Sequence, residues 1–161
     1  MILKKMKWSH YDDIMGAWLS SMSMEQKLDL RAAHIACFPV FLISMGFASV
    51  RWSERIINIF EEYSVYHKEQ EHCFKAMHTF IKETWMRTSK HFPRLIVILL
   101  KALYDLSDQD SCAKNKNYEN RVSSIVQCLN LLMKLAPEQM NKIGCDLRTD
   151  STFCEVVKKY F

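Results

Sequence analysis

Residues 93–106 read PRLIVILLKALYDL, and this stretch decides between a helical fold and a sheet fold. The apolar run 95–100 taken alone would fit a buried β-strand. The pattern continues without a break through Ala102, Leu103 and Leu106, however, which favours a helix. Pro93 suits the first turn of that helix, where its missing N–H group is not needed. We therefore predict a helix over residues 93–106 that is apolar nearly all round and buried on several sides.

The segments on both sides of this stretch also carry helical spacing. We predict a short amphipathic helix in the first twenty residues and a connection over residues 20–23, where Ser23 and Gln26 fit a capping box. Further helices are expected over residues 24–47, 53–66, 68–87, 118–135 and 136–143, with a loop over residues 107–117.

Three residues are expected to shape the ends and the course of these helices. Pro39 should kink or break the helix over 24–47, because it removes an internal hydrogen bond. Ser53 should cap the next helix, and Gly144 should end the last one.

The composition indicates an all-α fold. The chain has 161 residues but only 3 glycines and 3 prolines, which leaves few hairpin turns for a sheet. Helices that begin near residues 53 and 93 are about forty residues apart, as in HEAT and armadillo repeats. We predict a HEAT/armadillo-like α-solenoid of antiparallel helical hairpins over residues 24–147. Residues 1–23 would form an N-terminal segment and residues 148–161 a tail or terminal helix; a plain helical bundle is the alternative.

The six cysteines and one uncharged run of residues give information on where in the cell the protein is located. No signal peptide precedes the cysteines, which we interpret as reduced, mostly buried thiols of a cytoplasmic or nuclear protein. Residues 32–50 carry no Asp, Glu, Lys or Arg and could nearly span a bilayer. Because Arg31 and Arg51 flank the run equally and Pro39 lies inside it, we predict a buried helix and no membrane partner.

No catalytic or metal-binding motif stands out in the sequence. The densest Cys/His group is His67, His72, Cys73 and His78, but it lacks the paired spacing of zinc ligands. The neighbouring carboxylates Asp12–Asp13 and Glu61–Glu62 point apart on a helix and fit a solvated face. We expect no catalytic residue, metal site or cofactor, with Cys73 packed in the core and the histidines on the surface.

Charge is distributed unevenly along the chain. Residues 75–101 hold six basic residues and one acid, whereas residues 54–71 hold five acids and two bases. A solvated face is the favoured interpretation, and a basic ridge for an acidic partner or nucleic acid is the alternative. The net charge of +4 is too small to favour nucleic acid. The candidate partner-binding residues of the ridge are Lys75, Lys82, Arg87, Lys90 and Arg94.

Methionine and aromatic residues are abundant, with 10 methionines and an aromatic share of 12%. Most should lie in the core, but a surplus would suit an exposed apolar groove for partner helices. Trp8, Tyr11, Trp18 and Met22 are the expected groove residues, because their segment lacks a clear folding partner.

Four segments carry a resemblance to a known family: RWSERII (51–57), FIKETWMR (80–87), LLKALYDL (99–106) and CLNLL (128–132). Together they resemble the C-terminal region of the Tti-two family, over about residues 28–147. The family is a subunit of the Tel–Tti (TTT) co-chaperone complex. The resemblance implies a HEAT-like α-solenoid that docks on the Tti-one subunit, in a complex with Tel-two. That complex works with Hsp90 to fold and assemble PI3-kinase-related kinases.

The leading expectation is therefore a non-enzymatic subunit of this complex, with Tti-one-like and Tel-two-like partners. Two alternatives remain open. One is an unrelated armadillo-type module that binds protein or nucleic acid. The other is a helical-bundle interaction protein of the apoptosis-regulator type, although the sequence lacks the NWGR-like groove motif of such proteins.

Overall fold

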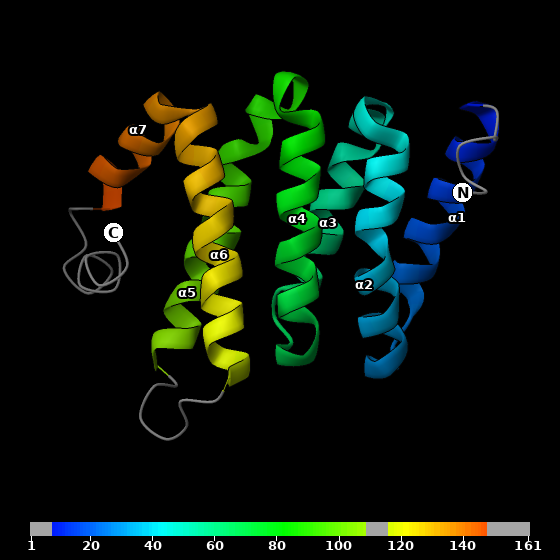
Figure 1. The fold of residues 1–161 in the computed structure, drawn as a ribbon, viewed down its shortest axis with the longest axis horizontal. Coiled ribbons are helices and arrows are strands. Elements are labelled where there is room, and N and C mark those ends of the chain that lie inside the picture. Colours follow the sequence, from blue (N-terminus) through cyan, green and yellow to red (C-terminus); the bar gives the residue numbers. More distant parts are fainter. Residues whose placement is uncertain (1–7, 109–115, 148–161) are drawn as a thin grey trace. The chain divides into compact units, whose positions relative to one another are not determined.

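Helices form every regular element in the part of the chain that this computed structural model describes, residues 8–108 and 116–147 (Figure 1). The predicted all-α class is confirmed there. The expected tail or terminal helix over residues 148–161 lies outside the described residues. In chain order the elements are α1 (Trp8–Met24), α2 (Leu28–Met45), the 3-10 helix η2 (Gly46–Trp52), α3 (Ser53–Tyr63), α4 (His67–Thr88), the 3-10 turn η3 (Ser89–His91), α5 (Phe92–Asp108), α6 (Lys116–Leu135) and α7 (Pro137–Leu147).

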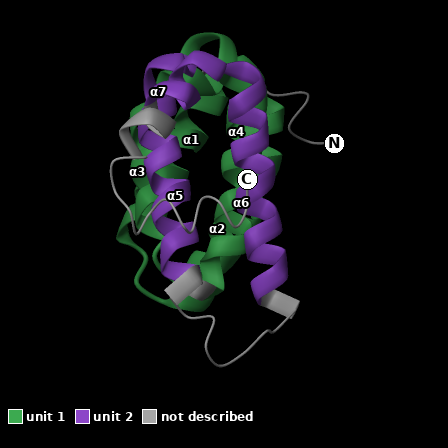
Figure 2. Ribbon diagram, turned by 90° about the vertical axis from the view of Figure 1, so that its left-hand side faces the viewer, with its two compact units in different colours: residues 1–87 green, residues 88–161 purple. Residues whose placement is uncertain are grey.

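The chain divides into two compact units (Figure 2). Unit 1 covers Met1–Arg87 and contains α1, α2, η2, α3 and α4, whereas unit 2 covers Thr88–Phe161 and contains η3 and α5 to α7. Each unit has its own buried apolar residues, so each is described by itself.

In unit 1 the first helix supplies part of the core. Tyr11, Met15, Leu19 and Met22 recur at three- and four-residue intervals and are buried, and α1 contacts both α2 and α3. Trp18 is half-buried, with its ring 4.4 Å from the ring of Phe41. The predicted groove at Tyr11, Trp18 and Met22 is therefore wrong, because these side chains do have a folding partner. The side chain of Trp8 lies outside the described residues.

The connection after α1 lies about four residues later than predicted. Residues 20–23 belong to α1, where the Ser23 hydroxyl donates a hydrogen bond to the Leu19 carbonyl 2.9 Å away instead of capping a new helix. The Glu25 carboxylate accepts hydrogen bonds from the backbone N–H groups of Gln26 and Lys27, at 3.0 and 2.9 Å. Glu25 thus satisfies backbone donors ahead of α2.

Pro39 does not break α2, which runs through it to Met45. Proline removes one internal hydrogen bond. Ile35, Phe38 and Leu42 on either side of it are fully buried, so packing holds the helix together across the gap. The helix ends at Gly46, whose φ of 50° favours glycine, and the N–H of this residue bonds to the Leu42 carbonyl.

Phe60 of α3 joins the neighbouring helices of unit 1. Its ring lies 6.2 Å from the ring of Phe38 on α2 and 5.9 Å from that of Phe80 on α4, edge to face in both pairs. Ser53 does not cap α3 as predicted. Its hydroxyl donates to the Val50 carbonyl of η2, an element that the sequence pattern did not predict.

Unit 2 is built on the pairing of α5 with α6, and α7 contacts both. The predicted helices over 93–106 and 118–135 are confirmed within two residues at each end. The buried side chains include Leu95, Ile96, Leu99 and Leu103 of α5 and Ile125, Cys128, Leu129 and Leu132 of α6. Gly144 does not end α7, which continues to Leu147. One glycine in a helix costs only about 1 kcal/mol, too little to stop it alone.

Candidate interaction surface

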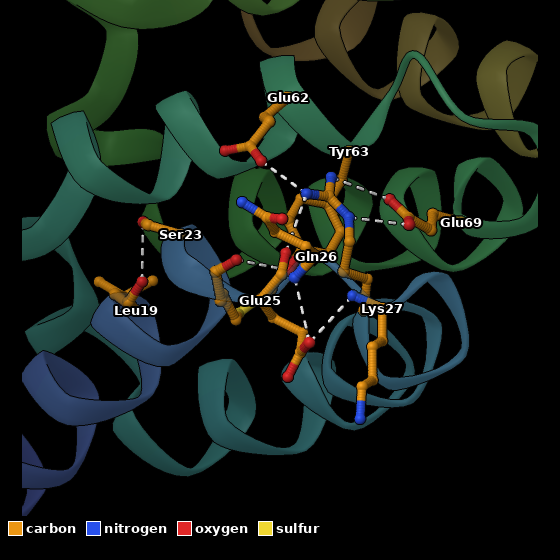
Figure 3. A network of polar contacts seen from close by, with 10 residues as sticks. Leu19, Ser23, Glu25, Gln26, Lys27, Glu62, Tyr63 and Glu69 are labelled. Atoms are coloured by element: carbon orange, nitrogen blue, oxygen red, sulfur yellow. Dashed lines mark hydrogen bonds and ion pairs between the residues drawn. The ribbon is translucent and has the colours of Figure 1, made fainter.

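A buried charge cluster holds the ends of three helices in unit 1 (Figure 3). The guanidinium of Arg31 on α2 donates from Nε and Nη2 to the two carboxylate oxygens of Glu69 on α4, at 2.9 and 3.2 Å. Its Nη1 donates to Glu62 of α3 at 2.6 Å. Glu69 is fully buried and Arg31 nearly so. Such a two-pronged pair fixes both distance and orientation, so it sets the spacing of α2 and α4 at this end.

Tyr63 completes the cluster from the last turn of α3. Its ring lies 4.0 Å from the guanidinium carbon of Arg31, and its hydroxyl donates a 2.8 Å hydrogen bond to the Met22 carbonyl of α1. Burial raises the pKa of Tyr63 to about 12, although the nearby Arg31 cation opposes the shift. Burial alone would lower the pKa of Arg31, but the hydrogen bonds to Glu69 and Glu62 more than offset it and leave that pKa raised.

The raised pKa of Tyr63 predicts a loss of stability in base. The folded state keeps the phenol protonated between its ordinary pKa of about 10 and the folded value of about 12, so folding weakens as the pH rises through this window. Tyr63→Phe removes the titrating group. Urea unfolding at a series of pH values should show the free energy of unfolding of the natural chain falling relative to that of Tyr63→Phe above pH 10. Parallel curves would contradict the assignment.

Contacts at both ends show that α2 and α4 run side by side in the same direction. Near their first residues, Lys68 of α4 donates a 3.2 Å hydrogen bond to Asp29 of α2. After the last turn of α2, the guanidinium of Arg87 on α4 lies 5.8 Å from the ring centre of Phe47 in η2. Figure 1 shows α2 and α4 in front of α1 and α3. Because both helices pack on α3, their exposed sides face the same way.

The exposed side of α2 and the start of η2 is mostly apolar, with Ser44 as its one exposed polar side chain between Ala33 and Phe47. We call it the apolar stripe. Val40, Ile43 and Phe47 are 55, 61 and 49% exposed, and no acidic residue occurs anywhere between Leu30 and Ser53. Isolated exposed apolar residues are common on soluble proteins, but a continuous set on one face marks an interaction site. The apolar stripe consists of Ala33, Ala36, Cys37, Val40, Ile43 and Phe47.

The predicted buried helix over residues 32–50 is buried on one side only, because its other side carries the apolar stripe. Within the described residues, the helical stretch Leu28–Tyr63 is long and apolar enough to cross a membrane by length and composition, and only 28% of its most apolar window is buried. Those two criteria alone are weak evidence for a membrane span, because core helices of soluble proteins also meet them. An uncharged run cannot reveal which of its faces is buried, which explains why the exposed side was not predicted.

The five predicted ridge residues do not belong to one unit. Lys75, Lys82 and Arg87 are exposed on α4 of unit 1, beside the apolar stripe, whereas Lys90 and Arg94 belong to unit 2. Lys75 forms an ion pair with Glu71 one turn earlier. Arg87 stacks on Phe47. The structure thus brings three of the five residues to the face that carries the apolar stripe.

The described members of the Cys/His group differ in burial. Cys73 is buried as predicted, and its thiol lies 3.5 Å from the Phe60 carbonyl. His72 and His78 are half-buried, so they lie only partly at the surface where they were predicted, and the side chain of His67 lies outside the described residues. Burial and the nearby Lys82 lower the pKa of His78. Among the described residues, no group of three or more Cys, His, Asp or Glu side chains is placed to bind a metal ion.

The paired carboxylates serve structure. Glu62 binds Arg31, and Asp12 binds both Arg51 at 2.7 Å and the indole N–H of Trp52 at 3.1 Å. Interpreting both pairs as a simple solvated face was therefore incomplete, since each pair contributes at least one member to a contact between elements.

The described cysteines differ in exposure. Cys73 and Cys128 are buried, whereas Cys37 is exposed in the middle of the apolar stripe, which agrees with the expectation that most of the thiols are buried. All three are free thiols.

Comparison with known proteins adds no relative. No family model, no curated protein and no solved structure matches this chain.

Proposed function

We propose that this chain is a non-enzymatic, protein-binding scaffold, and specifically a subunit of the Tel–Tti co-chaperone complex in the cytoplasm, the nucleus or both. The observation that carries a protein-binding function is the apolar stripe. Burying Val40, Ile43 and Phe47 against a partner would remove apolar surface from water, which favours association. The resemblance of four segments to the Tti-two family supports the specific complex.

We further propose that the helices stack as a HEAT-like α-solenoid. The register between α2 and α4 supports this arrangement, because Asp29 and Lys68 are 39 residues apart and lie at corresponding ends of parallel helices. HEAT and armadillo units are about 40 to 47 residues long. In such a stack the second helix of each hairpin forms one continuous wall, which is the surface that partners grip.

Co-purification from cells tests this function. The tagged full chain should recover Tti-one-like and Tel-two-like subunits, with Hsp90 and PI3-kinase-related kinases bound indirectly. The tag expressed alone is the control for nonspecific capture. A clean preparation that contains neither Tti-one-like nor Tel-two-like protein, identified by mass spectrometry, would reject the assignment to this complex.

A further inference from the structure

We propose that the apolar stripe and the neighbouring basic side chains of α4 bind one amphipathic helix whose polar flank is acidic. This inference rests on the proposed protein-binding function and specifies the partner's chemistry. It concerns Lys75, Lys82 and Arg87 on one side of the site and the six residues of the apolar stripe on the other.

The shape of the surface suits a helix. The apolar stripe follows α2 for about 15 Å from Ala33 to Ile43, roughly three helical turns, and ends on Phe47 just after the helix. Small side chains occupy one half of it, at Ala33, Ala36 and Cys37, and larger ones the other, at Val40, Ile43 and Phe47. Small residues let a second helix approach to the lower end of the usual interaxial distance of about 8–10 Å. A partner helix with apolar residues every three or four positions would fill this surface.

The positive charge beside the apolar stripe favours a partner helix with acidic residues on the side that faces α4. Between residues 75 and 87, α4 has three exposed basic residues, Lys75, Lys82 and Arg87, and one acid, the half-buried Glu83. Lys82 and Arg87 are exposed, and neither forms an ion pair with a carboxylate in the described part of the chain. Lys75 is already paired with Glu71, and α2 supplies no acid after Asp29, so Lys82 and Arg87 carry the positive charge that is left to meet a partner on this side. A helix with Glu or Asp on that flank would meet complementary charge.

A membrane surface is a poorer match. Interfacial binding grows with the apolar area inserted, and half of the apolar stripe consists of Ala and Cys, which offer little area. The basic side chains also lie along one flank only, on α4, as expected for a paired helix rather than a plane of anionic headgroups.

Peptide binding to the full chain tests the inference. The probe is a fluorescein-labelled peptide of about five helical turns, with Leu along one face and Glu on its flanks. A matched peptide carries Lys in place of Glu, and vesicles of phosphatidylcholine and phosphatidylserine represent a membrane. Fluorescence anisotropy should show binding of the Glu peptide that weakens with salt, and weaker binding of the Lys peptide. Equal binding of both peptides, or binding to vesicles alone, would overturn the proposal.

Two exposed positions provide a matched pair of variants. Ile43→Glu lies in the apolar stripe, and Val97→Glu makes the same kind of change at a similarly exposed site of unit 2, with exposures of 61 and 58%. Ile43→Glu should weaken binding of the Glu peptide by at least about tenfold, as expected for a central contact, and Val97→Glu should leave the affinity unchanged. Lys82→Glu should weaken binding of the Glu peptide and strengthen binding of the Lys peptide. Circular dichroism confirms that each variant remains folded; equal affinities of Ile43→Glu and Val97→Glu would overturn the proposal.

The failure of this inference is distinguishable from the failure of the proposed function. If the Tel–Tti subunits co-purify equally well with Ile43→Glu and with the natural chain, the complex is right and the binding surface is wrong. If the Glu peptide binds as described but neither subunit co-purifies, the surface is right and the complex is wrong.

Discussion

Arg31→Met should destabilise unit 1 by about 3–5 kcal/mol, because it leaves the carboxylate of Glu69 buried without its cation. The Glu69 side chain is fully buried, and both of its carboxylate oxygens would lose the hydrogen bonds that Arg31 now donates. A loss of this size is a large share of the 5–15 kcal/mol that stabilises a typical domain. Urea unfolding followed by far-ultraviolet circular dichroism measures the change in the free energy of unfolding.

Two further variants show whether the loss comes from the unpaired charge. Arg31→Met combined with Glu69→Leu removes both charges and should recover much of the lost stability. Lys68→Met breaks the ion pair of Lys68 with Asp29, in which both side chains are mostly exposed, and should cost no more than about 1 kcal/mol. A double variant as unstable as Arg31→Met alone would contradict the account of the cluster.

In unit 2 the largest effect is expected for Leu129→Asp. Leu129 is fully buried on α6, the helix that pairs with α5, so the variant loses apolar packing and buries a carboxyl group without a partner. The expected loss is more than about 3 kcal/mol, comparable to the larger losses measured for truncating a buried leucine. The melting temperature should fall accordingly in a thermal scan by circular dichroism.

Glu119→Ala is the matched control on the same helix. Glu119 is exposed in the first turn of α6, and its removal should change the free energy of unfolding by no more than about 0.5 kcal/mol. Equal melting temperatures for Leu129→Asp and Glu119→Ala would contradict the assignment of the buried and exposed faces of α6.

The sequence predicted the helices of the middle of the chain well, and the reason is local. In α4, α5 and α6 the apolar residues recur at helical spacing, and Pro93 lies in the first turn of α5 as expected. The serines near residue 20 were misleading. Ser20 and Ser23 donate hydrogen bonds to carbonyls four residues earlier inside α1, so a residue typical of caps lies within a helix.

The candidate site was mostly not predictable from local pattern. Arg31 and Glu69 are 38 residues apart, and nothing in their neighbourhoods pairs them. One signal was present, because Glu69 lies four residues before Cys73 on the apolar face of α4, an unusual place for an acid. The apolar stripe was hidden for a different reason. A run without charges has no polar face to orient it, so its exposed side emerges only from the contacts of α2 with α1 and α3.

Thiol labelling of Cys37 in a partner complex tests the central claim most directly. The free chain should label at exposed Cys37 under native conditions, whereas buried Cys73 and Cys128 should label only after unfolding. In a complex recovered from cells, peptide mapping should show Cys37 protected, since a helix seated on the apolar stripe covers it. Unchanged labelling of Cys37 in a complex that stays assembled would contradict the claim that this face binds the partner.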